Sequence, residues 1–182
     1  MNRRTLAASR PRRRAPWCVL VDTREQAPWP LVELIEANNL PFTVEVATLR
    51  TGDYVLREAP HLIVERKNLG DLVGCVGHGR ERFERELARL ESEARQRFVL
   101  VEASVADVER HQYRADAVKP AHVLGSVAGW SLTFGVHFWF CGSPTSAAAA
   151  ALRLFGIVRS RMLRTEDADE LIAPASVEAL RA

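Results

Sequence analysis

Strand-length apolar runs alternate with helical patterns along most of this chain, and this alternation limits its fold more than any other feature. The runs at 17–21, 62–64 and 98–101 are almost continuously apolar, as expected of strands that are covered on both faces. The clearest helix has apolar residues at helical spacing, at Phe83, Leu87, Leu90 and Ala94. The alternation predicts an α/β sandwich, in which helices flank a central sheet.

Turn and cap residues mark the boundaries of single elements. Asn68 is a suitable N-cap for the helix that follows it, and Pro120 and Gly135 mark the first turn and the end of a later helix. A last long helix is expected over 143–163. The predicted order is strand, helix, three strands, two helices, strand, helix, strand, helix, in one domain over 16–165 without internal repeats.

Cysteine usage and hydropathy indicate the cellular compartment of the protein. The three cysteines, Cys18, Cys75 and Cys141, are far apart and form no C-x-x-C pair, which argues against a disulfide framework and a zinc site. No apolar run approaches the roughly 20 residues of a membrane span, and no apolar segment follows the basic N-terminus. We therefore expect a cytoplasmic protein without a membrane partner.

Basic residues are concentrated at the N-terminus. Residues 1–15 hold six arginines and no acid, although the net charge of the whole chain is only +2. We expect a disordered arm whose Arg12, Arg13 and Arg14 neutralise DNA phosphates; the alternative is a solvated leader before the folded domain. Residues 166–182 are acidic and then alanine-rich, and we expect them to form a frayed C-terminal tail or a small extra helix.

The strand that ends at Lys67 carries charges that a buried strand rarely holds. Side chains alternate along a strand, so Glu65 and Lys67 point to one face, about 6.6 Å apart along the backbone, and Arg66 points to the other. Asp53 begins the preceding strand. If the two strands form a hairpin, Asp53 and Glu65 meet at one end of the sheet, where Asp22 can join them from the first strand.

Carboxylates and a lysine in this arrangement are suited to the hydrolysis of phosphodiesters. The hard oxygen ligands of Asp53, Glu65 and Asp22 suit Mg²⁺ or Mn²⁺. Such a cation polarises a phosphate and lowers the pKa of a water molecule. Lys67 then orients or deprotonates the water, or stabilises charge in the transition state. The residues alone leave these roles of Lys67 open.

Four stretches of the sequence, taken in order, resemble a known family: VDTRE (21–25), GDYVL (52–56), IVERKNLGDL (63–72) and GRERFERELARL (79–90). They are similar to the nuclease domain of the XPF and archaeal Hef structure-specific DNA endonucleases, which carries GD…ERK-x-x-x-D. The resemblance covers residues 17–164. It implies a restriction-endonuclease-like three-layer sandwich around a mixed sheet. It also implies a metal-dependent endonuclease that cuts branched, flap or fork DNA in repair or recombination.

The resemblance implies a metal site built from the matching residues. Asp53 and Glu65 are its ligands, and the main-chain carbonyl of Arg66 is a third oxygen. Lys67 is the catalytic lysine. Asp22 is an outer acid that supports the metal directly or through water.

Other matching residues are implied to lie beside this site. Arg24 contacts a phosphate or holds a carboxylate, next to Glu25. Asp71 either takes part in catalysis, paired with an arginine, or favours the helix dipole from the first turn. Arg80, after a glycine-rich loop, is expected to contact DNA phosphates, with solvated charge as the alternative. A solvated face is predicted for the other arginines of this helix, Arg82, Arg85 and Arg89.

Partners follow from the same resemblance. Family nuclease domains pair through helices of their C-terminal half, and the apolar stretches 121–134 and 146–158 predict a homodimer. The tandem helix-hairpin-helix domains that family members usually carry have no match in this sequence, so we expect the arginine arm or a partner protein to supply affinity for branched DNA. The rival hypotheses are a non-catalytic DNA-binding scaffold and a different nuclease on the same fold. The joint presence of Asp53, Glu65 and Lys67 argues against a scaffold.

Overall fold

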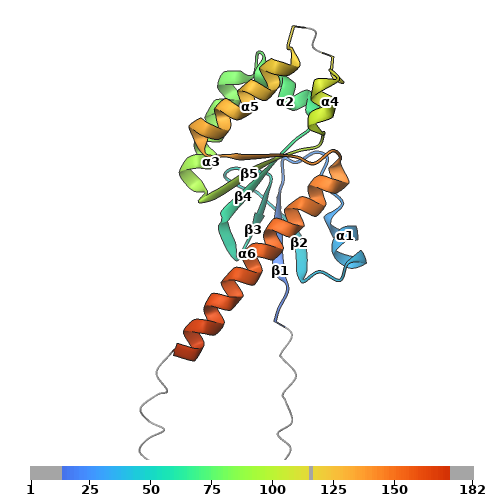
Figure 1. The fold of residues 1–182 in the computed structure, drawn as a ribbon. Coiled ribbons are helices and arrows are strands. Elements are labelled where there is room, and N and C mark those ends of the chain that lie inside the picture. The colour runs from blue at the N-terminus through green and yellow to red at the C-terminus, as the bar shows by residue number, and fades with distance from the viewer. Residues whose placement is uncertain (1–13, 115–116, 173–182) are drawn as a thin grey trace, which may run out of the picture.

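A six-stranded sheet forms the centre of the computed structural model, which describes residues 14–114 and 117–172 (Figure 1). The strands are β1 (Trp17–Asp22), β2 (Phe42–Ala47), β3 (Tyr54–Leu56), β4 (Ala59–Lys67), β5 (Gln96–Val101) and β6 (His137–Phe140). Their order across the sheet is β2-β1-β3-β4-β5-β6. β3 runs antiparallel to β1 and β4, and the other neighbouring pairs are parallel, so the predicted mixed sheet is confirmed.

Helices cover both faces of this sheet (Figure 1). One face packs against α1 (Leu31–Ala37) and α6 (Pro144–Ile172). The other face carries α2 (Leu69–Val76), α3 (Arg80–Glu93), α4 (Val105–Glu109) and α5 (Pro120–Phe134). Each face has its own buried apolar cluster. The predicted α/β three-layer sandwich of restriction-endonuclease-like type is therefore confirmed.

Most predicted boundaries hold, and the two main differences have simple causes. The side chain of Asn68 caps α2 by accepting from the Asp71 N–H, and Gly135 ends α5 in the left-handed region at φ 59°. The unpredicted α4 has only five residues, held by a capping box at Ser104, and is too short to show apolar periodicity. The last helix, α6, continues to Ile172, past its predicted end at 163, because no proline or glycine interrupts the acidic segment.

Strand order and direction decide where the charged strand ends lie. β1 and β4 both pair antiparallel with the short β3 between them. The C-terminal ends of β1 and β4 therefore lie beside the N-terminal end of β3. This brings Asp22, Asp53 and Glu65 to the same end of the sheet.

Some predictions concern residues outside the described ranges. Arg12 and Arg13 of the arginine arm lie there, as do residues 173–182 of the expected tail.

Within the described residues, no helix combines the length and the apolar character that crossing a membrane requires.

Candidate active site

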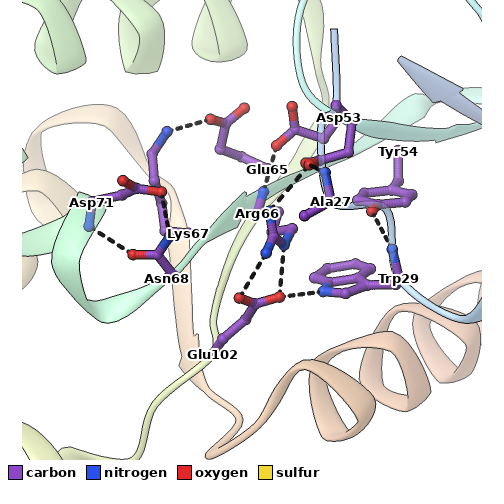
Figure 2. A network of polar contacts seen from close by, with 11 residues as sticks. Ala27, Trp29, Asp53, Tyr54, Glu65, Arg66, Lys67, Asn68, Asp71 and Glu102 are labelled. Atoms are coloured by element: carbon purple, nitrogen blue, oxygen red, sulfur yellow. Dashed lines mark hydrogen bonds and ion pairs between the residues drawn. The ribbon is translucent and has the colours of Figure 1, made fainter. Parts of the chain in front are cut away.

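β3 and β4 bring Asp53, Glu65 and Lys67 to one end and one face of the sheet (Figure 2). Tyr54 pairs with Val64, and the backbone N–H of Asp53 donates to the Val64 carbonyl over 3.0 Å. Tyr54 and Val64 belong to the cluster under α1 and α6. Because side chains alternate along a strand, their neighbours Asp53 and Glu65 face the opposite layer together.

The two carboxylates crowd each other. Burial, together with the neighbouring charge of Glu65, raises the pKa of Asp53 to about 7. Burial also raises the pKa of Glu65, in spite of the opposing effect of Lys67. Both shifts mean that the fold disfavours two negative charges at this place, and a bound cation would relieve that cost.

Lys67 is held as a cation between acids. Its Nζ donates to Glu65 Oε1 over 2.6 Å and lies 3.7 Å from Glu86 Oε2 and 5.1 Å from the centroid of the Phe83 ring. Burial alone would lower the pKa of Lys67, but the charge and hydrogen bond of Glu65, with the charge of Glu86, raise that pKa above its ordinary value. In this arrangement Lys67 is protonated, with its ammonium group next to the carboxylate pair.

Asp22 uses its carboxylate to hold the loop that follows β1. Asp22 Oδ1 accepts from the Arg24 N–H at 2.8 Å and from Arg24 Nε at 2.7 Å, and Oδ2 accepts from the Leu49 N–H at 2.7 Å. The side-chain hydrogen bond from Arg24 is the main reason why the pKa of Asp22 falls to about 2. Asp22 thereby fixes the guanidinium of Arg24 at the edge of the site, where the side chain of Arg24 is 66% exposed.

Arg66 points to the opposite face and forms a buried ionic cluster. Its Nε and Nη2 donate to the two oxygens of Glu102 over 2.6 and 3.0 Å, and its Nη1 donates to Glu25 Oε1 over 3.1 Å. The main chain of Arg66 serves the first face, because its N–H donates to Asp53 Oδ2 over 2.7 Å (Figure 2). Glu102 was not among the residues that the sequence predicted near the site. Like Glu65, it directly follows an apolar run, and this position could have marked it as a charged residue at a strand end.

Asp71 and His78 complete the rim of the site. Asp71 lies in the first turn of α2, where its carboxylate accepts from Asn68 Nδ2 over 2.7 Å. Asn68, rather than the arginine we expected, is thus its partner. His78, in the glycine-flanked loop between α2 and α3, lines the same cleft.

Comparison with known proteins gives this arrangement a family. The family model described as "ERCC4 domain" matches residues 21–153. The chain belongs to the ERCC4 domain family. Among solved structures, XPF from Aeropyrum pernix shares the fold, with a TM-score of 0.64 and 22% identity over 85% of this chain and 71% of that chain. A second structure, XPF from Aeropyrum pernix in complex with DNA, gives a TM-score of 0.61 and 23% identity over 80% of this chain and 66% of that chain. Among curated proteins, no match was found. The predicted resemblance to XPF-type nucleases is thereby confirmed.

The cleft of this ERCC4 domain is lined by both acids and arginines. It has a volume of about 1260 Å³, and Asp53, Glu65 and Lys67 line it. The arginines at its wall include Arg82 and Arg89 of α3. Both are exposed, as the predicted solvated face requires, and Arg82 Nε lies 3.9 Å from Glu86 Oε1 one helical turn away; the structure adds that they border the cleft. Helical spacing places these two on one flank of α3, but only the packing of α3 decides that this flank faces the cleft.

Arg80 does not line the cleft. Its Nη1 donates to Glu84 Oε1 over 3.0 Å, its Nη2 donates to Ser126 Oγ, and its guanidinium lies 5.1 Å from the Trp130 ring centroid. It faces a separate hollow of about 800 Å³ against α5. Phosphate binding by Arg80 therefore stays a prediction, which the structure places outside the carboxylate cleft.

The donor set of this ERCC4 domain fits a divalent cation, although it is small. Within the described ranges, no three His, Cys, Asp or Glu side chains gather as a ready metal cluster. The two side chains that do meet, Asp53 and Glu65, offer hard carboxylate oxygens, which Mg²⁺ and Mn²⁺ prefer. Mg²⁺ commonly uses one or two carboxylates and takes its other ligands from water and substrate phosphates.

Proposed function

We propose that this ERCC4 domain is a divalent-metal-dependent endonuclease that hydrolyses phosphodiester bonds in DNA. The observation that carries the proposal is the adjacency of the Asp53 and Glu65 carboxylates to the Lys67 ammonium group in an open cleft walled by arginines. Buried acids that repel each other destabilise the folded state, so such a pair is expected where a bound cation neutralises the repulsion. The solved complex of XPF from Aeropyrum pernix with DNA supports DNA as the substrate.

In this proposal Asp53 and Glu65 would hold Mg²⁺ or Mn²⁺, together with the main-chain carbonyl of Arg66. When bound there, such a cation would polarise the scissile phosphate and lower the pKa of the attacking water. Asp22 contributes as an outer support, through its bonds to Arg24 and the Leu49 N–H.

The charged side chains around this pair handle the substrate. Lys67, which is protonated, stabilises the negative charge that grows on the phosphate in the transition state. Arg24, exposed at the edge of the cleft, binds a neighbouring phosphate. Glu25 accepts a hydrogen bond from Arg66 on the other face and holds it in place. Asp71 lies in the first turn of α2, where its negative charge stabilises the start of the helix beside the site.

We further propose that the DNA is branched, with flap or fork structure, and that the reaction serves repair or recombination. Arg82 and Arg89 of the cleft wall supply phosphate contacts. The basic arm, including Arg12, Arg13 and Arg14, or a partner protein adds affinity. This part of the proposal rests on the family and on the placement of the cleft arginines.

A homodimer is proposed through the C-terminal half. α5 buries Val123, Val127 and Trp130, yet its Leu132 is 88% exposed. Ile157 on α6 is also exposed, at 50%. Exposed apolar side chains of this size favour a surface that a second copy of the chain covers in a dimer.

Light scattering of the wild type and of Leu132→Glu tests the homodimer. We expect the wild type to be a dimer and the variant, with its added charge, to be a monomer. A monomeric wild type would contradict the proposal.

Cleavage assays test the catalytic proposal against the alternative of a non-catalytic scaffold. Labelled fork, flap, splayed-arm and linear duplex DNA are incubated with the wild type, Asp53→Ala and Lys67→Ala, in Mg²⁺, Mn²⁺ or EDTA. We expect metal-dependent cutting of branched DNA that falls by about 10²-fold or more in each variant. Binding without cutting in either metal would establish the scaffold instead, and full activity of Lys67→Ala would remove the role of that lysine.

A further inference from the structure

Glu102 lies behind the proposed site, on the face of the sheet to which the side chain of Arg66 points. It follows β5, and its backbone N–H donates to the Lys67 carbonyl over 2.9 Å. Its side chain is 4% exposed and does not line the cleft. Glu102 therefore has no access to a phosphate or cation in the cleft, and any effect it has on the site passes through other residues.

Three hydrogen bonds converge on the Glu102 carboxylate. Two come from the guanidinium of Arg66, at 2.6 and 3.0 Å, in the bidentate geometry that fixes both partners. The third comes from the indole Nε1 of Trp29, at 2.6 Å. Because all three groups are largely buried, each bond is strong and its loss leaves a buried polar group unpaired.

Both residues that donate to Glu102 also contact Asp53 or its chain neighbour Tyr54. The backbone N–H of Arg66 donates to Asp53 Oδ2 over 2.7 Å, so the residue that Glu102 clamps also orients Asp53 (Figure 2). Trp29 stacks on Tyr54 with ring centroids 4.3 Å apart, and its backbone N–H donates to the Tyr54 hydroxyl. Tyr54 is the next residue after Asp53, so Glu102 acts on Asp53 from two sides.

We propose that Glu102 is a positioning residue, which holds Arg66 and Trp29 so that the Arg66 amide keeps the Asp53 carboxylate beside that of Glu65. This inference rests on the proposed function, because it assumes that this pair binds a cation. The same clamp fixes the peptide unit between Arg66 and Lys67, whose carbonyl is the third proposed ligand. Removing an outer partner of ligating residues typically costs 10–100-fold in metal affinity.

Calorimetric titration of Mn²⁺ into the full chain tests the inference without DNA. Glu102→Gln keeps the shape of the side chain and loses its charge, so we expect Mn²⁺ affinity to fall about tenfold. Glu109→Gln is the matched control, since Glu109 is exposed on α4, and its affinity should equal that of the wild type. A folded Glu102→Gln that binds Mn²⁺ as tightly as the wild type overturns the inference and leaves the proposed function intact. A wild type that binds no Mn²⁺ overturns the proposed function itself.

A second variant and a second readout separate positioning from folding. Trp29→Phe preserves the stacking on Tyr54 and removes the indole donor, so it decides the matter should Glu102→Gln fail to fold. We expect a several-fold loss of Mn²⁺ affinity, and an unchanged affinity counts against the inference. In cleavage assays, excess Mn²⁺ should restore kcat in both variants, with KM for DNA unchanged. If Glu102 had only a structural role, the variants would yield less folded protein, but the Mn²⁺ concentration that gives the half-maximal rate would equal that of the wild type. That result would overturn the inference.

Discussion

The charged residues of the site destabilise the folded state when no cation is bound. Asp53 and Glu65 are both raised in pKa by burial, and Lys67 does not cancel the repulsion between them. Natural proteins keep such unfavourable pairs where function requires them. The carboxylate pair should therefore cost stability whenever no cation is bound.

The first prediction concerns this cost. In EDTA at pH 8, Asp53→Asn should raise the free energy of unfolding by on the order of 1–2 kcal/mol, because one buried charge is removed. Asn retains an oxygen that accepts from the Arg66 N–H. Urea denaturation measures the change, and the advantage of the variant should shrink when Mn²⁺ is added. A destabilised Asp53→Asn in EDTA would show that the pair is not under electrostatic strain.

The second prediction uses the opposite shift, at Asp22. Since Arg24 lowers the pKa of Asp22 to about 2, the charged form stabilises the fold at all pH values above the ordinary pKa of 3.8, and this stabilisation is lost as the pH falls from about 4 to about 2. Asp22→Asn should cost about 1–2 kcal/mol at pH 7, a figure reduced for the exposure of Arg24. The difference between wild type and variant, measured by urea denaturation, should shrink as the pH falls from about 4 to about 2 and should vanish only below about pH 2. A difference that is constant down to that pH would contradict the account.

At the scale of elements, β4 serves two purposes through strand alternation. Its odd-numbered residues at the end, Glu65 and Lys67, form the cleft face, and Arg66 locks the other face to β5 and the loop after β1. The turn before β3 sets the position of Asp53 against this strand. Gly52 in that turn has φ +73°, and a Cβ there would overlap Cγ2 of Ile63 on β4.

The third prediction follows from this close approach. Gly52→Ala should cost about 2 kcal/mol or more, because it combines left-handed backbone strain with a clash, and it should lower cleavage by displacing Asp53. Gly142→Ala is the matched control, because Gly142 has φ +82° but nothing lies within 4 Å of the position that its Cβ would take, and about 1 kcal/mol is expected there. Equal costs in denaturant titrations would mean that the approach of Ile63 does not constrain the turn.

How far the sequence predicts these elements depends on where the determining contacts lie. Alternation along the strand that ends at Lys67 was enough to place Glu65 and Lys67 opposite Arg66, because this information is local. Glu102 and Trp29 could not be connected to Arg66, since those contacts join segments that are adjacent only in the folded sheet. The orientation of α3 likewise depends on packing, so the sequence alone could not tell that the exposed Arg82 borders the cleft or that Arg80 faces α5.

At the scale of the whole molecule, the cleft gathers positive charge around its acidic centre. Arg82 and Arg89 face it from one flank of α3, and Arg85 on the same helix does not line it. DNA binding that neutralises phosphates weakens with salt in proportion to the number of contacts. The arginines that face the cleft should therefore be distinguishable from the one that does not.

The fourth prediction is that Arg82→Gln and Arg89→Gln each weaken DNA binding and reduce the slope of log K against log salt by about 1. Arg85→Gln is the matched control on α3 and should leave affinity and slope as in the wild type. Fluorescence anisotropy across a salt series, in EDTA to prevent cutting, gives both quantities. If Arg85→Gln matched the other two variants, the DNA would follow a different surface.

Anomalous diffraction at the manganese edge, recorded from crystals soaked in Mn²⁺, would locate a divalent cation bound by Asp53 and Glu65 next to Lys67. We expect one strong peak per chain that contacts both carboxylates and disappears in Asp53→Asn. A peak elsewhere, or none between these two side chains at millimolar Mn²⁺, would contradict this prediction.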